Sequence, residues 1–303
     1  MSAHTDLESL LIKEGNRHVA LDQNFSHKTI PCLGNVGWSH YSKAMSHALD
    51  PHCHENAFEI CFIKRGTTSW WVGGNSFDLQ PGELFITWPD ELHGGVDGIM
   101  HPCELYWVIF TLSPEKGSFG ILPQETKQIL DQLNAIDHRR CRAPSCIANH
   151  FEHLLAALAS GQHFSDLTVK ASMQLLLCDV LQAFSASPGA NQPTRKGYSL
   201  RIQRAVNWMH QEIGNQITME DAARTTGLKS AQFRSNFLRE TGFSPVDYLT
   251  RIRIQKAKGV LLETSTSVTD IAFNLGFSSS QYFATVFRRL TGSTPRDFRN
   301  TYR

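Results

Sequence analysis

Three histidines and one glutamate are spaced so that they could bind a metal ion or line a pocket. His52 and His54 are separated by one residue, Glu59 follows, and His93 lies further along the chain. Alternate residues of a β-strand point to the same side, so His52 and His54 can face one interior. Imidazole and carboxylate groups suit zinc, iron, nickel or manganese. The same side chains could contact an organic effector or be structural, and the sequence leaves these three alternatives open.

The segments around these residues predict a small β-sandwich or barrel. Short runs rich in Trp, Phe, Ile and Val alternate with Gly and Pro, which is typical of such folds. The runs are residues 58–63, 68–72, 83–87 and 105–110. The Gly73-Gly74 pair predicts a hairpin turn. Strand alternation sends Trp70 and Trp71 to opposite faces, so at most one of them lines the interior.

Tryptophans of the same region are further candidate ligand contacts. Their faces stack on sugar rings and other flat ligands, although aromatic side chains also fill the core of a small barrel. We therefore expect a pocket in this region, with an effector bound among its polar and aromatic side chains. The predicted effector-binding residues are His52, His54, Glu59, Trp88 and His93.

The histidine spacing resembles the two sequence motifs of cupin barrels. The first motif is complete, with His-x-His, Glu59 after four further residues and Gly66 after six more. The second departs from the pattern, because Trp88 and Asp90 stand where cupins have Pro and Gly. This departure weakens the case for a metal, so no cofactor is predicted. If a metal does bind, the expected ligands are His52, His54, Glu59 and His93.

The last hundred residues contain one pattern twice. Each copy opens with a residue that can cap a helix, Thr218 or Ser267, followed three positions later by Asp. The first helix of each copy is expected to end at Gly227 or Gly276. A Phe-x3-Phe pair then predicts the buried face of a second helix. Two short helices joined by such a turn form a helix-turn-helix, whose second helix enters the DNA major groove.

The outward faces of these second helices carry the candidate DNA contacts. Arg pairs bidentately with guanine and Gln with adenine, so Gln232 and Arg234 should make the first motif the stronger base reader. A helix from Pro245 to about Glu263 should hold the two motifs roughly 34 Å apart, one DNA turn. The predicted DNA-binding residues are Ser230, Ala231, Gln232, Arg234, Ser235, Ser279, Ser280, Gln281, Tyr282 and Thr285. Phosphates or acidic groups of the same domain are expected to engage Arg239, Arg288, Arg289, Arg296 and Arg299.

Charge divides the chain into two unlike parts. From Thr194 onward there are 17 Lys and Arg against 8 Asp and Glu, whereas the preceding residues hold 12 and 20. A basic domain suits the phosphate backbone of double-stranded DNA, because each neutralised phosphate releases counterions.

The repeated region, residues 199–303, resembles the DNA-binding domain of AraC/XylS-type transcription regulators. The second copy nearly matches the family signature, in the order Ile271-Ala272-x3-Gly276-Phe277-x4-Tyr282-Phe283-x3-Phe287-Arg288-Arg289. The resemblance implies sequence-specific DNA binding, RNA polymerase as a partner and a small-molecule effector. It favours an activator and, with the aromatic residues, a carbohydrate effector.

We predict an α+β chain of two domains. Residues 1–186 form a cupin-like β-barrel followed by helices, and they bind the effector and make a homodimer through the helices between 123 and 184. Residues 187–198 are a linker rich in small residues, Pro and Gly. Residues 199–303 are an all-α domain with two helix-turn-helix motifs.

Composition indicates a cytoplasmic protein. The seven cysteines are an odd number, with no Cys-x-x-Cys, which favours reduced thiols over a disulfide framework. The first residues are polar and charged, unlike a secretory signal, and no membrane span is expected.

The predicted function is a ligand-responsive, DNA-binding transcription regulator that is not an enzyme. Effector binding in the barrel would alter the arrangement of the DNA-binding domains. Two alternatives use the histidine cluster: a metal-sensing regulator, and a metal-dependent cupin enzyme fused to a DNA-binding domain.

Overall fold

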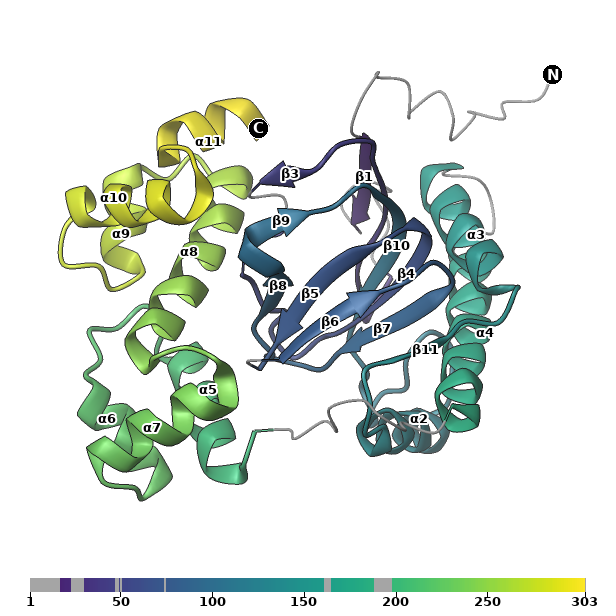
Figure 1. The fold of residues 1–303 in the computed structure, drawn as a ribbon, viewed down its shortest axis with the longest axis horizontal. Helices are drawn as coiled ribbons and strands as arrows, with labels where there is room; N and C mark the ends of the chain where they lie inside the picture. The colour runs from purple at the N-terminus through teal and green to yellow at the C-terminus, as the bar shows by residue number, and fades with distance from the viewer. Residues whose placement is uncertain are drawn as a thin grey trace.

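The computed structural model describes residues 17–22, 30–46, 49, 51–73, 75–160, 165–187 and 198–302. A β-rich N-terminal part is followed by helices, and a helical C-terminal part lies against one side of the sheets (Figure 1). This arrangement confirms the predicted α+β class. The predicted linker lies almost wholly outside the described residues.

Within the described residues, the N-terminal part contains a six-stranded antiparallel sheet in the order β1-β2-β10-β4-β7-β11. A three-stranded sheet, β6-β5-β8, shares an apolar core with it, and β3 pairs with β9. The strands are β1 (Arg17–Asp22), β2 (Leu33–Tyr41), β3 (Met45–Ser46), β4 (Phe58–Gly66), β5 (Thr68–Val72), β6 (Asn75–Leu79), β7 (Glu83–Thr87), β8 (His93–Gly95), β9 (Ile99–Met100), β10 (Cys103–Phe110) and β11 (Arg140–Arg142).

Side-chain alternation on the central strands separates two interiors. On β4, Phe58 and Ile60 face the helical side, whereas Cys61 and Ile63 belong to the core between the sheets. Both faces of this strand are buried, which explains why its sequence is a continuous apolar run with one acidic residue, Glu59. The alternation therefore points Glu59 into the barrel interior.

The segment between 123 and 184 is largely helical, as predicted, and its three helices pack on the outer face of the six-stranded sheet. They are α2 (Pro123–Ala135), α3 (Ile147–Ser160) and α4 (Ser165–Ala186). Their apolar faces share one core with β2, β4, β7 and β10. The prediction missed β11, three residues between α2 and α3 that pair with the edge strand β7. A strand this short has no periodicity that a sequence pattern could reveal.

Helix α4 is long and apolar enough to cross a bilayer by length and composition alone. A helix buried in a protein core meets the same criterion. Eight residues of α4 are buried, and Met173, Leu176 and Val180 belong to the core under the sheet. Core packing therefore accounts for the apolar residues on the inner face of this helix.

The C-terminal part folds as two helix-turn-helix units joined by one long helix. The helices are α5 (Leu200–Gln211), α6 (Met219–Thr226), α7 (Ser230–Thr241), α8 (Pro245–Glu263), α9 (Val268–Asn274), α10 (Ser280–Thr291) and α11 (Pro295–Tyr302). Thr218, Ser244 and Ser267 cap three of them, each accepting a hydrogen bond from the backbone N–H of an Asp three positions later. The predicted capping residues and helix bounds are confirmed.

Each unit has its own core around the predicted phenylalanine pair. Phe233 and Phe237 are fully buried beneath α5 and α8, and Phe283 and Phe287 are buried in the second unit. Gly227 ends α6 with a φ of 66°, a left-handed conformation that favours glycine. The short turns that follow place α7 and α10 as the second helices of the two motifs.

Candidate functional site

A cavity of about 530 Å³ lies inside the barrel and opens toward α8. Its wall includes His52, His54 and Glu59, three of the predicted effector-binding residues. Helix α8 contributes part of the same wall, so the cavity is bounded by both parts of the chain. The α8 residues are Gln255, Lys258 and Leu262.

Two tryptophans give this cavity aromatic walls. Trp70 lines it, whereas Trp71 points the other way and contacts Phe243 at 5.0 Å between ring centroids, so the predicted alternation is confirmed. The indole of Trp107 packs directly on Gly37 of the neighbouring strand. A Cβ added at position 37 would lie only 1.9 Å from the indole, so a larger residue there would displace the ring. Trp107 also donates from its indole nitrogen to Asn35 at 2.7 Å. The close approach and the hydrogen bond together fix this ring at the cavity wall.

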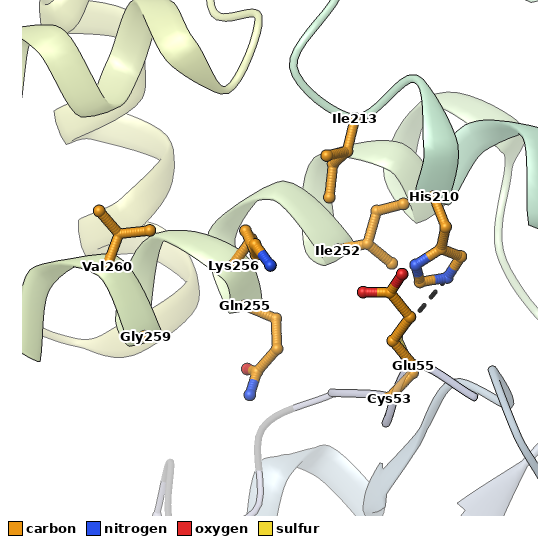
Figure 2. A pocket seen from close by; sticks show the side chains of 9 residues that line it. All are labelled: Cys53, Glu55, His210, Ile213, Ile252, Gln255, Lys256, Gly259 and Val260. Atoms are coloured by element: carbon orange, nitrogen blue, oxygen red, sulfur yellow. Dashed lines mark hydrogen bonds between the residues drawn. The ribbon is translucent and has the colours of Figure 1, made fainter. Parts of the chain in front are cut away.

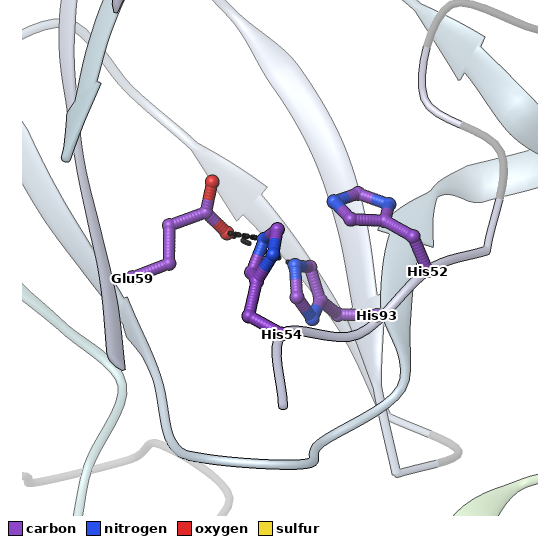
Figure 3. Close-up of side chains that lie close together, drawn as sticks. All are labelled: His52, His54, Glu59 and His93. Carbon is purple, nitrogen blue, oxygen red and sulfur yellow. Dashed lines mark ion pairs between the residues drawn. The ribbon is translucent and has the colours of Figure 1, made fainter. Parts of the chain in front are cut away.

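The predicted cluster of histidines and glutamate converges at one end of the cavity (Figure 3). Glu59 Oε2 lies 2.9 Å from Nε2 of His93 and 3.7 Å from Nε2 of His54. His52 lies outside the named strands and pairs with His93, the first residue of β8, through two backbone hydrogen bonds of 2.9 Å. The predicted strand here is therefore only a β-bridge, but it still places His52 and His54 on the same side.

Electrostatics keeps the Glu59 carboxyl ionised. Burial alone would raise the pKa of Glu59, but the contacts with His54 and His93 outweigh burial and hold it well below its usual range. Both histidine Nε2 atoms are buried without a hydrogen bond of good geometry. The cluster is thus a negative carboxylate facing two nitrogen atoms that lack full hydrogen bonding.

This donor set fits a divalent metal ion. One ligand atom from each of His52, His54, Glu59 and His93 lies within 4.8 Å of the others. His93 Nδ1 donates to the Glu91 carbonyl at 2.7 Å, so Nε2 is the nitrogen that faces the cluster, and it would bind a metal ion on giving up its proton. Such an outer hydrogen bond is how proteins orient metal-binding histidines. These four residues would hold the ion, which would supply a Lewis-acidic centre to the cavity.

Trp88, the remaining predicted effector contact, lies outside this cavity. It is 2% exposed, belongs to the core under the helices, and donates its indole N–H to Leu133 at 2.9 Å. The guanidinium of Arg139 lies 4.9 Å above its ring. The structure thus separates Trp88 from the other predicted effector contacts, because spacing in the sequence does not reveal which core a loop residue joins.

The predicted DNA-contacting residues lie on the outward faces of α7 and α10. Gln232 and Arg234 are exposed on α7, and Gln281 and Tyr282 are exposed on α10. Ala231, Ser235 and Thr285 are exposed as well, and Ser230 and Ser280 are half-buried. Ser279 is occupied as a helix cap, because its hydroxyl accepts the backbone N–H of Tyr282 at 3.1 Å. Apart from that cap, the outward faces remain available to a DNA groove.

Two half-buried arginines, Arg253 and Arg299, hold α8 in place, and the sequence did not indicate this role. Arg253 donates to the carbonyls of Ile213, Asn215 and Gly276, which belong to different helix-turn-helix units. Arg299, for which phosphates or acidic groups of the same domain were expected as partners, donates instead to the carbonyls of Leu261 and Thr266. The motifs are therefore held in one relative arrangement by charged hydrogen bonds.

The barrel also docks directly on the first motif. Tyr248 of α8 donates to the Asp90 carbonyl at 3.1 Å, and Leu92 belongs to the apolar core of α5–α8. Cys53 lies 3.9 Å from Nε2 of His210, beside a hollow of about 220 Å³ between the two parts (Figure 2). Burial raises the pKa of Cys53 to about 12 and lowers that of His210. Both groups are thus uncharged at neutral pH, as an apolar interface requires.

Comparison with known proteins identifies both parts. Residues 40–177 match the AraC-like ligand binding domain, and residues 222–301 match a helix-turn-helix domain. The HTH-type transcriptional activator RhaS of Klebsiella pneumoniae is 27% identical over 251 residues, covering 82% of this chain and 87% of that protein. RhaS of Escherichia coli strain SE11 is 26% identical over 256 residues, with the same coverage of both chains.

A solved structure shares the fold over nearly the whole chain. Apo ToxT of Vibrio cholerae aligns with a TM-score of 0.55, covering 96% of this chain and 99% of its own, at 10% identity. That likeness concerns the fold alone. The family follows from the two matched domains together with the relatives above: the chain belongs to the AraC family of ligand-binding, helix-turn-helix transcription regulators.

Proposed function

We propose that the effector binds in the barrel cavity and acts on DNA binding through α8. The observation that carries this proposal is the α8 segment in the cavity wall, at Gln255, Lys258 and Leu262. The same helix carries Arg253, which connects both motifs. A ligand in the cavity therefore meets the element that sets the arrangement of the two recognition helices.

The mechanism rests on differential affinity. A ligand shifts an equilibrium only as far as it binds one arrangement better than the other. An effector that touches both the barrel and α8 gains those α8 contacts only while the two parts are docked. Effector binding therefore favours the docked arrangement, and the DNA affinity of that arrangement decides the sign of the response.

The effector is a small polar organic molecule, and we favour a sugar or sugar acid. Trp70 and Trp107 offer flat faces for a ring. Asn35 and the histidines offer hydrogen bonds, and Lys258 offers a cation to an acidic group. The curated relatives are transcriptional activators, so activation is the proposed direction.

A thermal-shift screen of the full chain tests this proposal. Sugars, sugar acids, aromatic acids and divalent metals are the ligands, and one present at 100 times its Kd should add about 2.7 kcal/mol of stability. Lys258→Ala should weaken binding of an acidic hit and abolish its effect on DNA affinity. Lys256→Ala, two positions away beside the smaller hollow, is the matched control. A ligand that binds and signals equally well in both variants would place the effector elsewhere.

A second candidate function is sensing of a metal ion by His52, His54, Glu59 and His93. The favouring observation is the orientation of His93, whose Nδ1 is held by the Glu91 carbonyl while Nε2 faces Glu59. A metal-only stabilisation that His54→Ala removes would support this reading. Membership in a regulator family favours sensing over catalysis, so we propose that the chain is not an enzyme.

The base contacts are proposed to come mainly from α7. Arg234→Ala should cost about 1–3 kcal/mol at one base position and relax the preference there. Lys229→Ala, at the cap position before α7, should instead weaken binding evenly across sequences. Selection of binding sites from a random duplex library gives both profiles. An unchanged Arg234→Ala profile would remove this residue from the base contacts.

We further propose a homodimer through α4. Its outward stripe contains Leu167, Ala171, Leu175 and Cys178, spaced by four, four and three residues. This spacing gives one continuous apolar face along the helix. Leu175→Lys should convert the dimer to a monomer in sedimentation, whereas Leu122→Lys, at another exposed leucine, should not. A monomeric wild-type chain would refute the proposed interface.

The remaining proposals follow the family. RNA polymerase is the proposed partner of the DNA-bound activator. In vitro transcription should then increase when the protein is bound at the promoter.

We propose a cytoplasmic location and a division into residues 1–186, 187–198 and 199–303. Limited proteolysis that cuts first within 187–198 is the expected result for that division.

A further inference from the structure

We propose a second metal site, for a zinc-type divalent ion, formed by Cys146, His150 and Asp179 on the α3–α4 pair. It goes beyond the proposed function and lies outside the effector cavity. One ligand atom from each residue lies within 4.8 Å of the others. Among the described residues, only this group and the barrel cluster bring three or more such side chains together.

The two helices bring these ligands together from distant positions. Cys146 directly precedes α3, and His150 lies four residues later on the same face of that helix. Asp179 lies on α4, which packs against α3. No carboxylate lies one helical turn from His150 along the chain, so spacing in the sequence does not complete a set of ligands there. Helix packing supplies the missing carboxylate.

The distances show convergence on one point. Asp179 Oδ2 accepts a hydrogen bond from Cys146 Sγ at 3.0 Å and from His150 Nε2 at 2.7 Å. Ligand atoms around a tetrahedral zinc ion lie roughly 3.4 Å apart, given bonds of about 2.0–2.3 Å. Small rotations of three side chains would therefore open the cluster around an ion.

The chemistry of the donors selects the ion. One sulfur, one imidazole nitrogen and one carboxylate oxygen suit zinc and cobalt, whereas magnesium and calcium require oxygen ligands. The His150 and Asp179 side chains are 12% and 27% exposed. They are therefore ordered by packing and still reachable by an ion from solvent, with a fourth position left for water.

A bound ion would tie the start of α3 to the second half of α4. Asp179 directly follows Cys178, a member of the outward stripe of α4. The ion would thus stiffen the helix pair at the edge of the proposed dimer face. Its expected effect is on the stability of this pair and not on the effector cavity.

Cobalt titration of the full, reduced and chelator-treated chain tests the proposal. Cobalt bound through a thiolate gives a charge-transfer band in the near ultraviolet, and one equivalent per chain is expected. Cys146→Ser should abolish the band. His150→Ala and Asp179→Asn should weaken cobalt binding by more than the roughly 10–100-fold typical of losing an outer-shell partner. Zinc should displace the cobalt.

Two matched variants separate this site from the other cysteines. Cys178→Ser changes the exposed neighbouring thiol, and Cys61→Ser changes the thiol beside Glu59 in the barrel. Both should keep the band. A band that survives Cys146→Ser, or is lost in Cys61→Ser, would overturn the proposal. Absence of the thiolate band in the wild-type chain would also overturn the proposal. That outcome is independent of the effector screen, which tests the cavity and not this site. Melting of each variant without metal confirms that it is folded.

Discussion

Replacing Arg139 with alanine should destabilise the N-terminal domain by about 3–5 kcal/mol, because it leaves a buried carboxylate without its partner. Arg139 donates to both oxygens of Glu91 at 2.7 and 2.8 Å, and the two side chains are 7% and 6% exposed. Glu91 also accepts the backbone N–H of Trp88 at 2.9 Å. The substitution therefore removes a bidentate pair and the cation above the Trp88 ring.

Denaturant unfolding followed by tryptophan fluorescence would measure this loss. Five of the six tryptophans precede residue 190, so the signal reports mainly the N-terminal domain. The neighbouring Arg140→Ala is the control, because its contacts with Glu83 at 4.0 Å and with the Asp78 carbonyl are solvent-exposed, so the expected loss is only about 1 kcal/mol. Arg139→Met with Glu91→Leu should recover much of the loss. Equal stability of both single variants would contradict the buried-pair argument.

The same substitution should also weaken the contact between the two domains. Asp90 and Leu92 flank Glu91, and both meet the first helix-turn-helix unit. Loss of Arg139 therefore loosens the loop that docks on α8. An effector response that falls together with stability is the expected result.

The second large effect is expected for Arg253→Ala, which should destabilise the C-terminal domain by about 3 kcal/mol or more. Arg253 makes three charged hydrogen bonds of 2.6–3.0 Å to backbone carbonyls, each worth about 1.5–3 kcal/mol. The carbonyls belong to the loop after α5 and to Gly276 after α9. DNA affinity should fall at sites that need both motifs, because their relative arrangement is no longer fixed.

Two controls separate geometry from charge. Arg253→Lys keeps the charge but lacks the planar fork, so most of the loss should remain. Arg224→Ala removes an exposed arginine paired only locally with Asp221, and should change stability by less than about 1 kcal/mol. Denaturation and DNA-binding anisotropy on a duplex from site selection give the two readouts. Wild-type values for Arg253→Ala in both would show that other contacts fix the motifs.

Local sequence signals specified much of the fold. Capping residues such as Thr218 and Ser244 act within one helical turn, so their pattern alone located the helix starts. The alternation that separates Trp70 from Trp71 is likewise a property of one strand. The cluster of His52, His54 and Glu59 followed from the same short-range geometry.

Other features depend on contacts between distant residues. Trp88 was expected in the effector pocket, yet α2 and Arg139 hold it in a different core. His150 gained Asp179 as a partner only because α3 packs on α4. A pattern in the sequence cannot show such neighbours, because they are set by which faces of separate elements pack together.

By itself the sequence determined the family, the two-part organisation, the duplicated motif and most candidate site residues, since each depends on spacing along one segment. Only the tertiary structure decided that α8 closes the effector cavity and that Arg253 joins the two motifs. About 200 residues separate Glu59 from Lys258. Both line one cavity only because the surface of one domain packs against the other, which no local periodicity encodes.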